Sequence, residues 1–141
     1  MEGRFAGVDW ASQEHAACIV DADGRIVEGR RYRHDERGLR ALCNRLIELG
    51  VGLVAVERPD GLLIERLLDA GLLVIAVHPN QVAASRPRFS AAGGKSDSFD
   101  AFVLAELART DSQRFRVLLL DQGAAALSRG VRRRRWRCFG P

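Results

Sequence analysis

The chain has 141 residues, of which 47% are hydrophobic and 28% charged, and its formal net charge is +4. This length fits one domain with a buried core. No apolar run approaches the roughly 20 residues of a membrane-spanning helix, and the first residues lack a signal-peptide pattern, so we expect a cytoplasmic protein that does not bind membranes. Three cysteines, Cys18, Cys43 and Cys138, form no CxxC pair. We expect them to be reduced, and the first two to be buried.

The positive charge is concentrated at the C-terminal end. Residues 121–141 hold six arginines and one aspartate, a balance of +5, which leaves −1 for the other 120 residues. We therefore divide the chain into a folded domain, 1–120, and a basic tail, 121–141, that is disordered or truncated. A near-neutral body argues against a surface built throughout for nucleic acid, although a local run of arginines binds phosphates in a salt-dependent way.

The predicted elements begin with three strands and then alternate. Alternating apolar residues and turn signals predict an antiparallel meander of strands at 4–9, 15–20 and 25–33. Helical spacing then predicts a helix from Leu39 to Leu49, which Gly50 ends. Further apolar patterns predict the following elements: a strand at 53–57, a helix at 62–70, a strand at 72–77 and a helix at 97–109.

Two segments have a less definite pattern. Residues 78–94 contain prolines, glycines and arginines, which indicates a loop or short helix beside a cleft. Residues 117–120 are a short apolar run that fits either a strand or a helix. The overall order indicates an α/β fold of the RNase H-like (RuvC-like) type, with a mixed five-stranded sheet in the order 3-2-1-4-5 and flanking helices. In that order the first and fourth strands are neighbours.

Four acidic residues stand where predicted elements meet loops: Asp9, Glu57, Asp97 and Asp100. Asp9 and Glu57 end two similar apolar strands, and Asp97 and Asp100 lie three apart on one helical face. Carboxylates are the ligands that Mg²⁺ prefers, and two such ions stabilise both the attacking and the leaving oxygen in phosphodiester cleavage. The set therefore predicts a two-metal catalytic site.

Each carboxylate also has an ordinary structural explanation. Asp97 fits the N-cap of a helix whose first turn includes Asp100. Glu57 fits a surface ion pair at a loop edge, and Asp9 a turn at the end of a strand. Together these explanations are weaker than a shared site, because all four positions converge in the expected fold.

Four separated segments carry a family resemblance: 7–11, 56–59, 77–82 and 94–101. In this order they resemble the signature segments of the DEDD transposases of bacterial insertion sequences, the insertion-sequence 110 family. The resemblance covers about residues 4–120.

The resemblance implies the N-terminal RuvC-like domain of a DNA transposase, in which Asp9, Glu57, Asp97 and Asp100 hold Mg²⁺ (or Mn²⁺). It also implies DNA as substrate, a structured guide (bridge) RNA as partner and a homo-oligomer. Family members carry a second, C-terminal domain with a nucleophilic serine. The sequence ends before such a domain, so we expect a chain that binds metal but does not recombine DNA alone.

Two other functions stay open. Actin-like kinases share the strand order, but Trp10 and Ala11 replace the glycine and hydroxyl residues that would cradle phosphate. A non-catalytic nucleic-acid-binding remnant would use the tail and the arginines of 78–94. For two aromatic residues near the site we favour structural roles: we expect His78 to form a hydrogen bond and Trp10 to cover the core.

Overall fold

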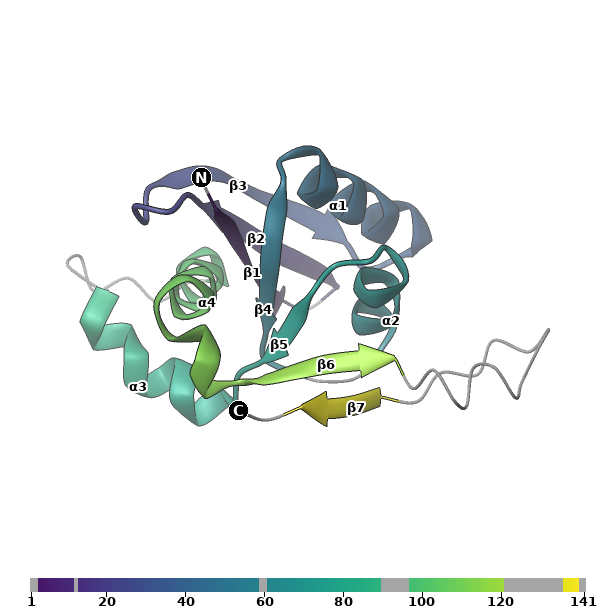
Figure 1. The fold of residues 1–141 in the computed structure, drawn as a ribbon. Coiled ribbons are helices and arrows are strands. Elements are labelled where there is room, and N and C mark those ends of the chain that lie inside the picture. The colour runs from purple at the N-terminus through teal and green to yellow at the C-terminus, as the bar shows by residue number, and fades with distance from the viewer. Residues whose placement is uncertain (1–2, 12, 59–60, 90–96, 121–135, 140–141) are drawn as a thin grey trace.

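The computed structural model describes residues 3–11, 13–58, 61–89, 97–120 and 136–139 (Figure 1). The strands are β1 (Arg4–Ala11), β2 (Glu14–Val20), β3 (Ile26–Arg33), β4 (Val51–Val56), β5 (Val74–Ala76), β6 (Arg116–Leu120) and β7 (Trp136–Phe139). The helices are α1 (Glu36–Glu48), α2 (Leu62–Asp69), α3 (Pro79–Phe89) and α4 (Asp97–Asp111), and a short 3₁₀ helix, η1 (Ser112–Arg114), follows α4.

All seven strands belong to one sheet in the order β3-β2-β1-β4-β5-β6-β7. β1 pairs with β2 in antiparallel fashion and with β4 in parallel fashion. The predicted order 3-2-1-4-5 is therefore confirmed, and β6 and β7 extend the predicted five-stranded sheet by antiparallel pairing beyond β5. Within the part of the chain that the structure describes, no helix is long and apolar enough to cross a membrane.

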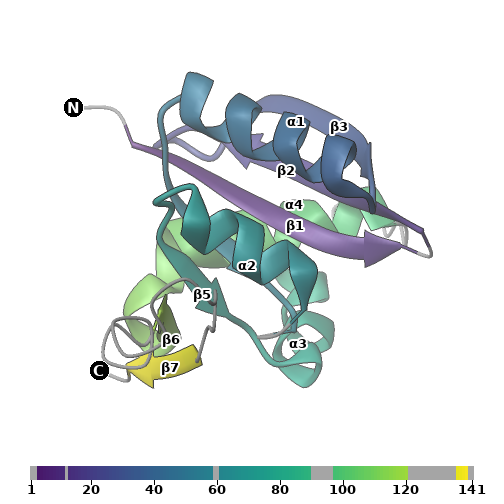
Figure 2. The same cartoon turned by 90° about the vertical axis from the view of Figure 1, so that its right-hand side faces the viewer.

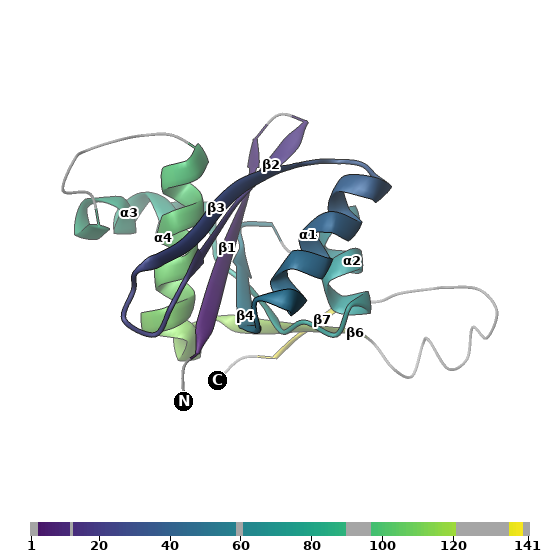
Figure 3. The same ribbon diagram turned by 90° about the horizontal axis from the view of Figure 1, so that it is seen from above.

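The helices cover the two faces of the sheet. α1 and α2 lie side by side on one face (Figure 2), while α4 crosses the other face with α3 beside it (Figure 3). Successive residues of β1 alternate between these faces, because side chains alternate across a strand. Ala6 and Val8 are buried in the core under α1 and α2. Gly7 and Asp9 therefore face α4.

Gly7 lets α4 approach the sheet very closely. A Cβ atom at this position would lie 2.1 Å from the carbonyl oxygen of Ala101 and 2.6 Å from the Cβ of Leu104, both in α4. These distances are shorter than van der Waals contact, and the first involves helix backbone, which cannot move aside by rotating a side chain. The helix that carries two of the predicted site residues is thus held against β1 by the absence of a side chain.

The structure corrects one predicted boundary and decides between the alternatives for two ambiguous segments. The strand predicted at 72–77 is limited to β5, because Leu73 is an exposed residue ahead of the paired segment. The segment 78–94 contains a helix, α3, of which only Val82 is buried. The ambiguous run 117–120 belongs to a strand, β6, because it finds a partner in β5.

The basic tail contains a strand that the sequence analysis does not predict. Residues 136–139 form β7, which pairs with β6 through main-chain hydrogen bonds, and such bonds do not depend on an alternating side-chain pattern. Residues 121–135 lie outside the described residues, so the expectation for that part of the tail stays a prediction. Of the cysteines, Cys18 and Cys43 are free and buried as expected.

Replacing Gly7 with alanine should destabilise the protein by at least about 2 kcal/mol, because the added methyl group forces α4 away from the sheet. Urea unfolding followed by circular dichroism measures the change. Gly29→Ala in β3 is the matched control, since its new Cβ would meet nothing within 4 Å. Equal stability of Gly7→Ala and Gly29→Ala would contradict the close packing at Gly7.

Candidate functional site

Asp9 and Glu57 are brought together by the pairing of two parallel strands. Val8 is the register partner of Val56, so the next residues, Asp9 and Glu57, leave neighbouring strands at the same edge of the sheet. Asp9 is only 4% exposed and lies within β1, whereas Glu57 follows β4 and is partly exposed. The expected proximity of these two positions therefore follows directly from the sheet.

α4 brings the third and fourth acidic positions to the same region. Asp97 is the first residue of α4, and its side chain lies outside the described part of the structure. Asp100 lies one turn later, next to Ala101, whose backbone packs on Gly7 of β1. Because α4 packs on β1 at this point, the carboxylate of Asp100 approaches the sheet edge that carries Asp9 and Glu57.

Asp100 is held by Arg86 of α3. The Nε of Arg86 donates to Oδ1 of Asp100 at 2.8 Å, and Nη2 donates to Oδ2 at 2.9 Å. This two-point geometry is the strongest form of arginine–carboxylate pair. It joins α3 to α4, and it fixes the orientation of the Asp100 carboxylate.

The negative charges of Glu57 and Asp9 also act on the guanidinium of Arg86. The pKa of Arg86 is raised, first by its hydrogen bond to Asp100 and further by the negative charges of Asp100, Glu57 and Asp9. Arg86 is therefore paired with Asp100 and within electrostatic reach of Glu57 and Asp9. Sequence reasoning treated it as part of a polar segment, since no pattern of spacing shows that a cation from α3 reaches this cluster.

The chemistry of these residues suits a hard cation. Carboxylate oxygens are the preferred ligands of Mg²⁺ and Mn²⁺. Among the described residues, no three His, Cys, Asp or Glu side chains are close enough together to form a complete metal cluster. The carboxylates of Asp9, Glu57 and Asp100 are suitable ligands for a divalent ion. In the described structure, Asp100 is instead paired with Arg86.

A second cluster of side chains lies at the same sheet edge on the opposite face. Trp10 forms edge-to-face contacts with His15 and His34, with ring centroids 4.7 Å and 4.5 Å apart. Nε2 of His15 lies 2.9 Å from Nδ1 of His34, in hydrogen-bond distance. Trp10 is 43% exposed, so the expectation that it covers the core is wrong: it shields the two histidines and keeps one side in solvent.

Burial determines the protonation of this cluster. His15 is 1% exposed, and its pKa is lowered from 6.5 to about 4, first by burial and then by the neighbouring His34. His15 is therefore neutral at physiological pH.

His78 lies outside this cluster and is exposed, and its Nδ1 accepts a hydrogen bond of 3.0 Å from the backbone N–H of Asn80 at the start of α3. The expected structural hydrogen bond of His78 is confirmed.

Comparison with known proteins gives findings of two kinds. The family model of the DEDD transposases of insertion sequence IS110, described as a transposase, matches residues 6–137. A Sinorhizobium fredii protein named "Putative transposase y4uE" is 40% identical over 123 aligned residues, and the match covers 83% of this chain and 34% of that protein. The Streptomyces coelicolor "Mini-circle putative transposase for IS117" is 36% identical over 126 aligned residues, and the match covers 86% of this chain and 30% of that protein.

Among solved structures, T. thermophilus RuvC in complex with a Holliday junction substrate has a similar fold. The TM-score is 0.52 at 16% identity, and the similarity covers 78% of this chain and 97% of that chain. This likeness supports the RNase H-like (RuvC-like) fold. This chain spans about a third of the length of these two curated relatives.

The buried His15 predicts a loss of stability in mild acid. The unfolded histidine takes up a proton near pH 6.5, whereas the folded one resists until about pH 4, so the unfolded state is favoured as the pH falls between these values. The unfolding free energy should drop by about 2 kcal/mol between about pH 7.5 and about pH 5. Urea titrations at both pH values, followed by circular dichroism, measure the drop.

The control is His15→Leu, which replaces the titrating imidazole at this buried position with an apolar side chain. The pH dependence of this variant should be weaker than that of the wild type by about the same amount. An unchanged pH dependence in His15→Leu would show that another group controls the acid sensitivity.

Proposed function

This chain belongs to the DEDD transposases of the insertion-sequence 110 family, and we propose that it forms their metal-dependent, RuvC-like DNA-processing domain. The proposal assigns Asp9, Glu57, Asp97 and Asp100 as ligands of Mg²⁺ or Mn²⁺. The observation that carries it is the convergence of β1, β4 and α4 at one sheet edge: Asp9 and Glu57 follow the paired residues Val8 and Val56, and Asp100 adjoins Ala101, which packs on Gly7. A structural ion pair needs one carboxylate, whereas a metal site needs several.

The proposed ligands Asp9, Glu57 and Asp100 differ in how firmly the fold holds them. When bound, the cations would activate a water molecule and stabilise the leaving oxygen of a phosphodiester. Asp9 is buried within a central strand, so its carboxylate is fixed by the sheet. Glu57 begins a loop and has more freedom, while Asp100 is oriented through α4. A site in which Asp9 is fixed and Glu57 is adjustable would hold the cations while the DNA strand moves through the reaction.

Arg86 would act as a substitute cation in this site. Carboxylates that share a small region repel one another, and the repulsion is relieved by a positive charge. Arg86 supplies that charge to Asp100 directly, and to Glu57 and Asp9 at longer range. A divalent ion at the same carboxylates would compete with it. We therefore propose that Arg86 must leave Asp100, at least in part, for the metal to bind.

The substrate and partners follow from the family and are proposals for this chain. We propose DNA as substrate, a guide RNA as partner and assembly into homo-oligomers. The RuvC structure with a similar fold holds a Holliday junction, which is consistent with DNA as the substrate. Because the relatives are about three times as long, we propose that complete transposition also needs a second, serine-containing domain.

One observation favours a second candidate function, a non-catalytic nucleic-acid-binding domain. Both oxygens of Asp100 are already engaged by Arg86, as in a stable structural ion pair. A domain of this kind would bind nucleic acid without any response to divalent ions. Metal binding therefore separates the two functions.

The metal assignment predicts that Mg²⁺ or Mn²⁺ stabilises the folded chain. At an ion concentration about 100 times the dissociation constant, the stabilisation should be about 2.7 kcal/mol. Asp9→Asn and Asp100→Asn should each abolish most of it, as measured by thermal unfolding with and without the ion. Glu65→Gln, an acidic residue of α2 away from the site, is the control and should respond like the wild type. A folded wild-type chain that shows no stabilisation would favour the non-catalytic alternative.

The competition between Arg86 and metal makes a separate prediction. Arg86→Gln should bind Mn²⁺ about tenfold more tightly than the wild type, because the ion no longer displaces a bidentate cation. Isothermal titration calorimetry measures the dissociation constant. Arg88→Gln is the matched control, since Arg88 lies two residues along α3 and pairs with Asp111 instead. Weaker Mn²⁺ binding in Arg86→Gln would mean that Arg86 positions Asp100 for the metal.

A further inference from the structure

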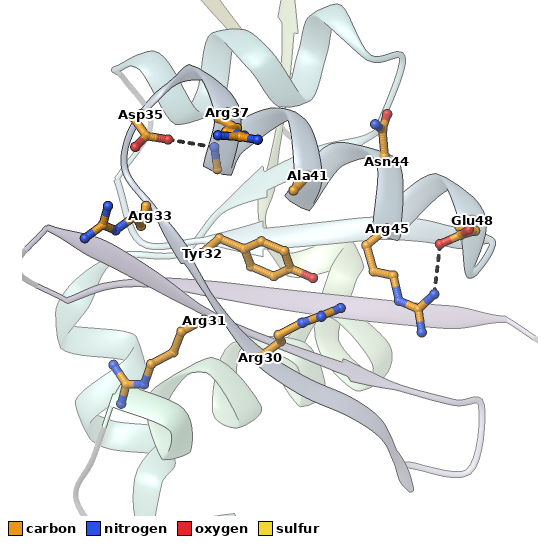
Figure 4. Close-up of a pocket in the computed structure, with 11 residues that line it drawn as sticks. Arg30, Arg31, Tyr32, Arg33, Asp35, Arg37, Ala41, Asn44, Arg45 and Glu48 are labelled. Atoms are coloured by element: carbon orange, nitrogen blue, oxygen red, sulfur yellow. Dashed lines mark hydrogen bonds and ion pairs between the residues drawn. The ribbon is translucent and has the colours of Figure 1, made fainter.

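The edge strand β3 and the start of α1 form a basic surface, which we call the β3–α1 surface. A hollow of about 660 Å³ lies between these elements and is lined by Arg30, Arg31, Arg33 and Arg37 together with Tyr32 (Figure 4). In Figure 4, Arg30 lies beside Tyr32, while Arg31 extends from the other side of the strand. Guanidinium groups therefore surround the sheet edge instead of lying on one face.

The charge of this segment is much larger than that of the rest of the body. Residues 25–45 hold seven arginines against three acidic residues, a balance of +4. Residues 1–120 together carry −1, so the remainder of the body carries −5. The near-neutral body is thus polarised, with a net positive charge in β3 and most of α1 and a net negative charge in the remainder.

The acidic residues of the segment are already engaged. Glu28 accepts a hydrogen bond of 2.6 Å from Nη2 of Arg45, and Glu36 accepts one of 2.6 Å from Nη2 of Arg66. Asp35 caps α1 by accepting from the backbone N–H of Gly38 at 2.7 Å. Asp35 and Glu48 also line the hollow, where they are outnumbered by five arginines, Arg30, Arg31, Arg33, Arg37 and Arg45.

The surface is also rigid where β3 meets α1. A Cβ on Gly38 would lie 2.1 Å from the carbonyl oxygen of Arg33, so the end of the strand packs directly on the first turn of the helix. The backbones that carry Arg33 and Arg37 are therefore fixed relative to each other. A fixed pair of cations loses less entropy on binding a ligand than two cations on a loop.

Strand register connects this surface with the carboxylates. Asp9 pairs with Ala16 of β2, and Ala16 pairs with Arg31 of β3. Paired residues share a face, so Arg31 lies on the same face as Asp9, two strand spacings or about 10 Å away. Only the methyl group of Ala16 stands between them in this row. Since β3 runs parallel to β1, Arg33 also ends its strand at the edge that carries Asp9.

We propose that the β3–α1 surface binds the phosphate backbone of a DNA duplex beside the carboxylate site. The choice of DNA rests on the proposed function. The physical reason is that a cluster of carboxylates repels the polyanion on which it acts, so DNA needs cations within a few phosphates of the site. Arg33 and Arg37 provide two such cations on a fixed scaffold, and they contact phosphates in a manner independent of base sequence.

Charged residues on an edge strand have another known role, because they prevent edge-to-edge aggregation of sheets. That role requires charge on β3 but no contact with nucleic acid. It predicts that loss of the charges promotes self-association and leaves DNA affinity unchanged. The two roles therefore give opposite results in a binding experiment.

The test compares two double variants of the full chain that both lower the net charge by the same amount. Arg33→Gln/Arg37→Gln removes two cations of the hollow, and Arg25→Gln/Arg40→Gln removes two cations of the same segment outside it. Fluorescence anisotropy with a labelled 25-base-pair DNA, in EDTA, measures affinity over a range of salt concentrations. An RNA duplex of equal length is measured in parallel.

We expect Arg33→Gln/Arg37→Gln to bind the DNA at least about tenfold more weakly, with a salt slope smaller by about 1.8, which is the loss of two phosphate contacts. The control should stay within about twofold of the wild type. Equal losses in both variants, no loss in either, or a loss confined to the RNA duplex would each overturn the proposal. Mn²⁺-dependent thermal stabilisation should be unchanged in both variants, so the metal site and the DNA surface succeed or fail independently.

Discussion

The close contact of α4 with β1 at Gly7 is the constraint on which the site depends. Only a residue without a side chain allows the backbone of α4 at Ala101 to approach the sheet at this point. That approach sets the position of Asp100 relative to Asp9, which lies two residues after Gly7 on the same face of β1. The position of the acidic residues is therefore set by packing in the core.

The cluster creates an electrostatic cost that other parts of the fold offset. Asp9 is buried, and burial of a carboxylate near others is unfavourable unless a cation is close. Arg86 provides this cation from α3, which explains why a helix with only one buried residue is held against α4. The bidentate pair thus links the stability of a weakly packed helix to the charge state of the site.

Much of the fold follows from periodicity, because burial on one face of a strand or helix leaves a pattern in the sequence. The meeting of Asp9 and Glu57 also follows, since the ends of neighbouring parallel strands share an edge. The position of Trp10 does not follow, because its partners His15 and His34 come from β2 and the β3–α1 junction, and a single aromatic residue has no period. β7 was missed because an edge strand is held by main-chain hydrogen bonds, which any residue forms.

Charge is the feature that sequence reasoning resolves least. A count along the chain places the excess of arginine in residues 121–141 and makes the body nearly neutral. The structure changes this interpretation, because the arginines of β3 and α1 gather on one part of the folded body, while Asp9, Glu57 and Asp100 lie at the end of β1 and β4. The pair of Glu28 with Arg45 is neutral within the basic surface, and Glu36 is paired with Arg66 of α2, outside it. A protein that processes a polyanion at carboxylates requires such a separation, since a uniform mixture of the same charges would neither hold cations nor attract phosphate.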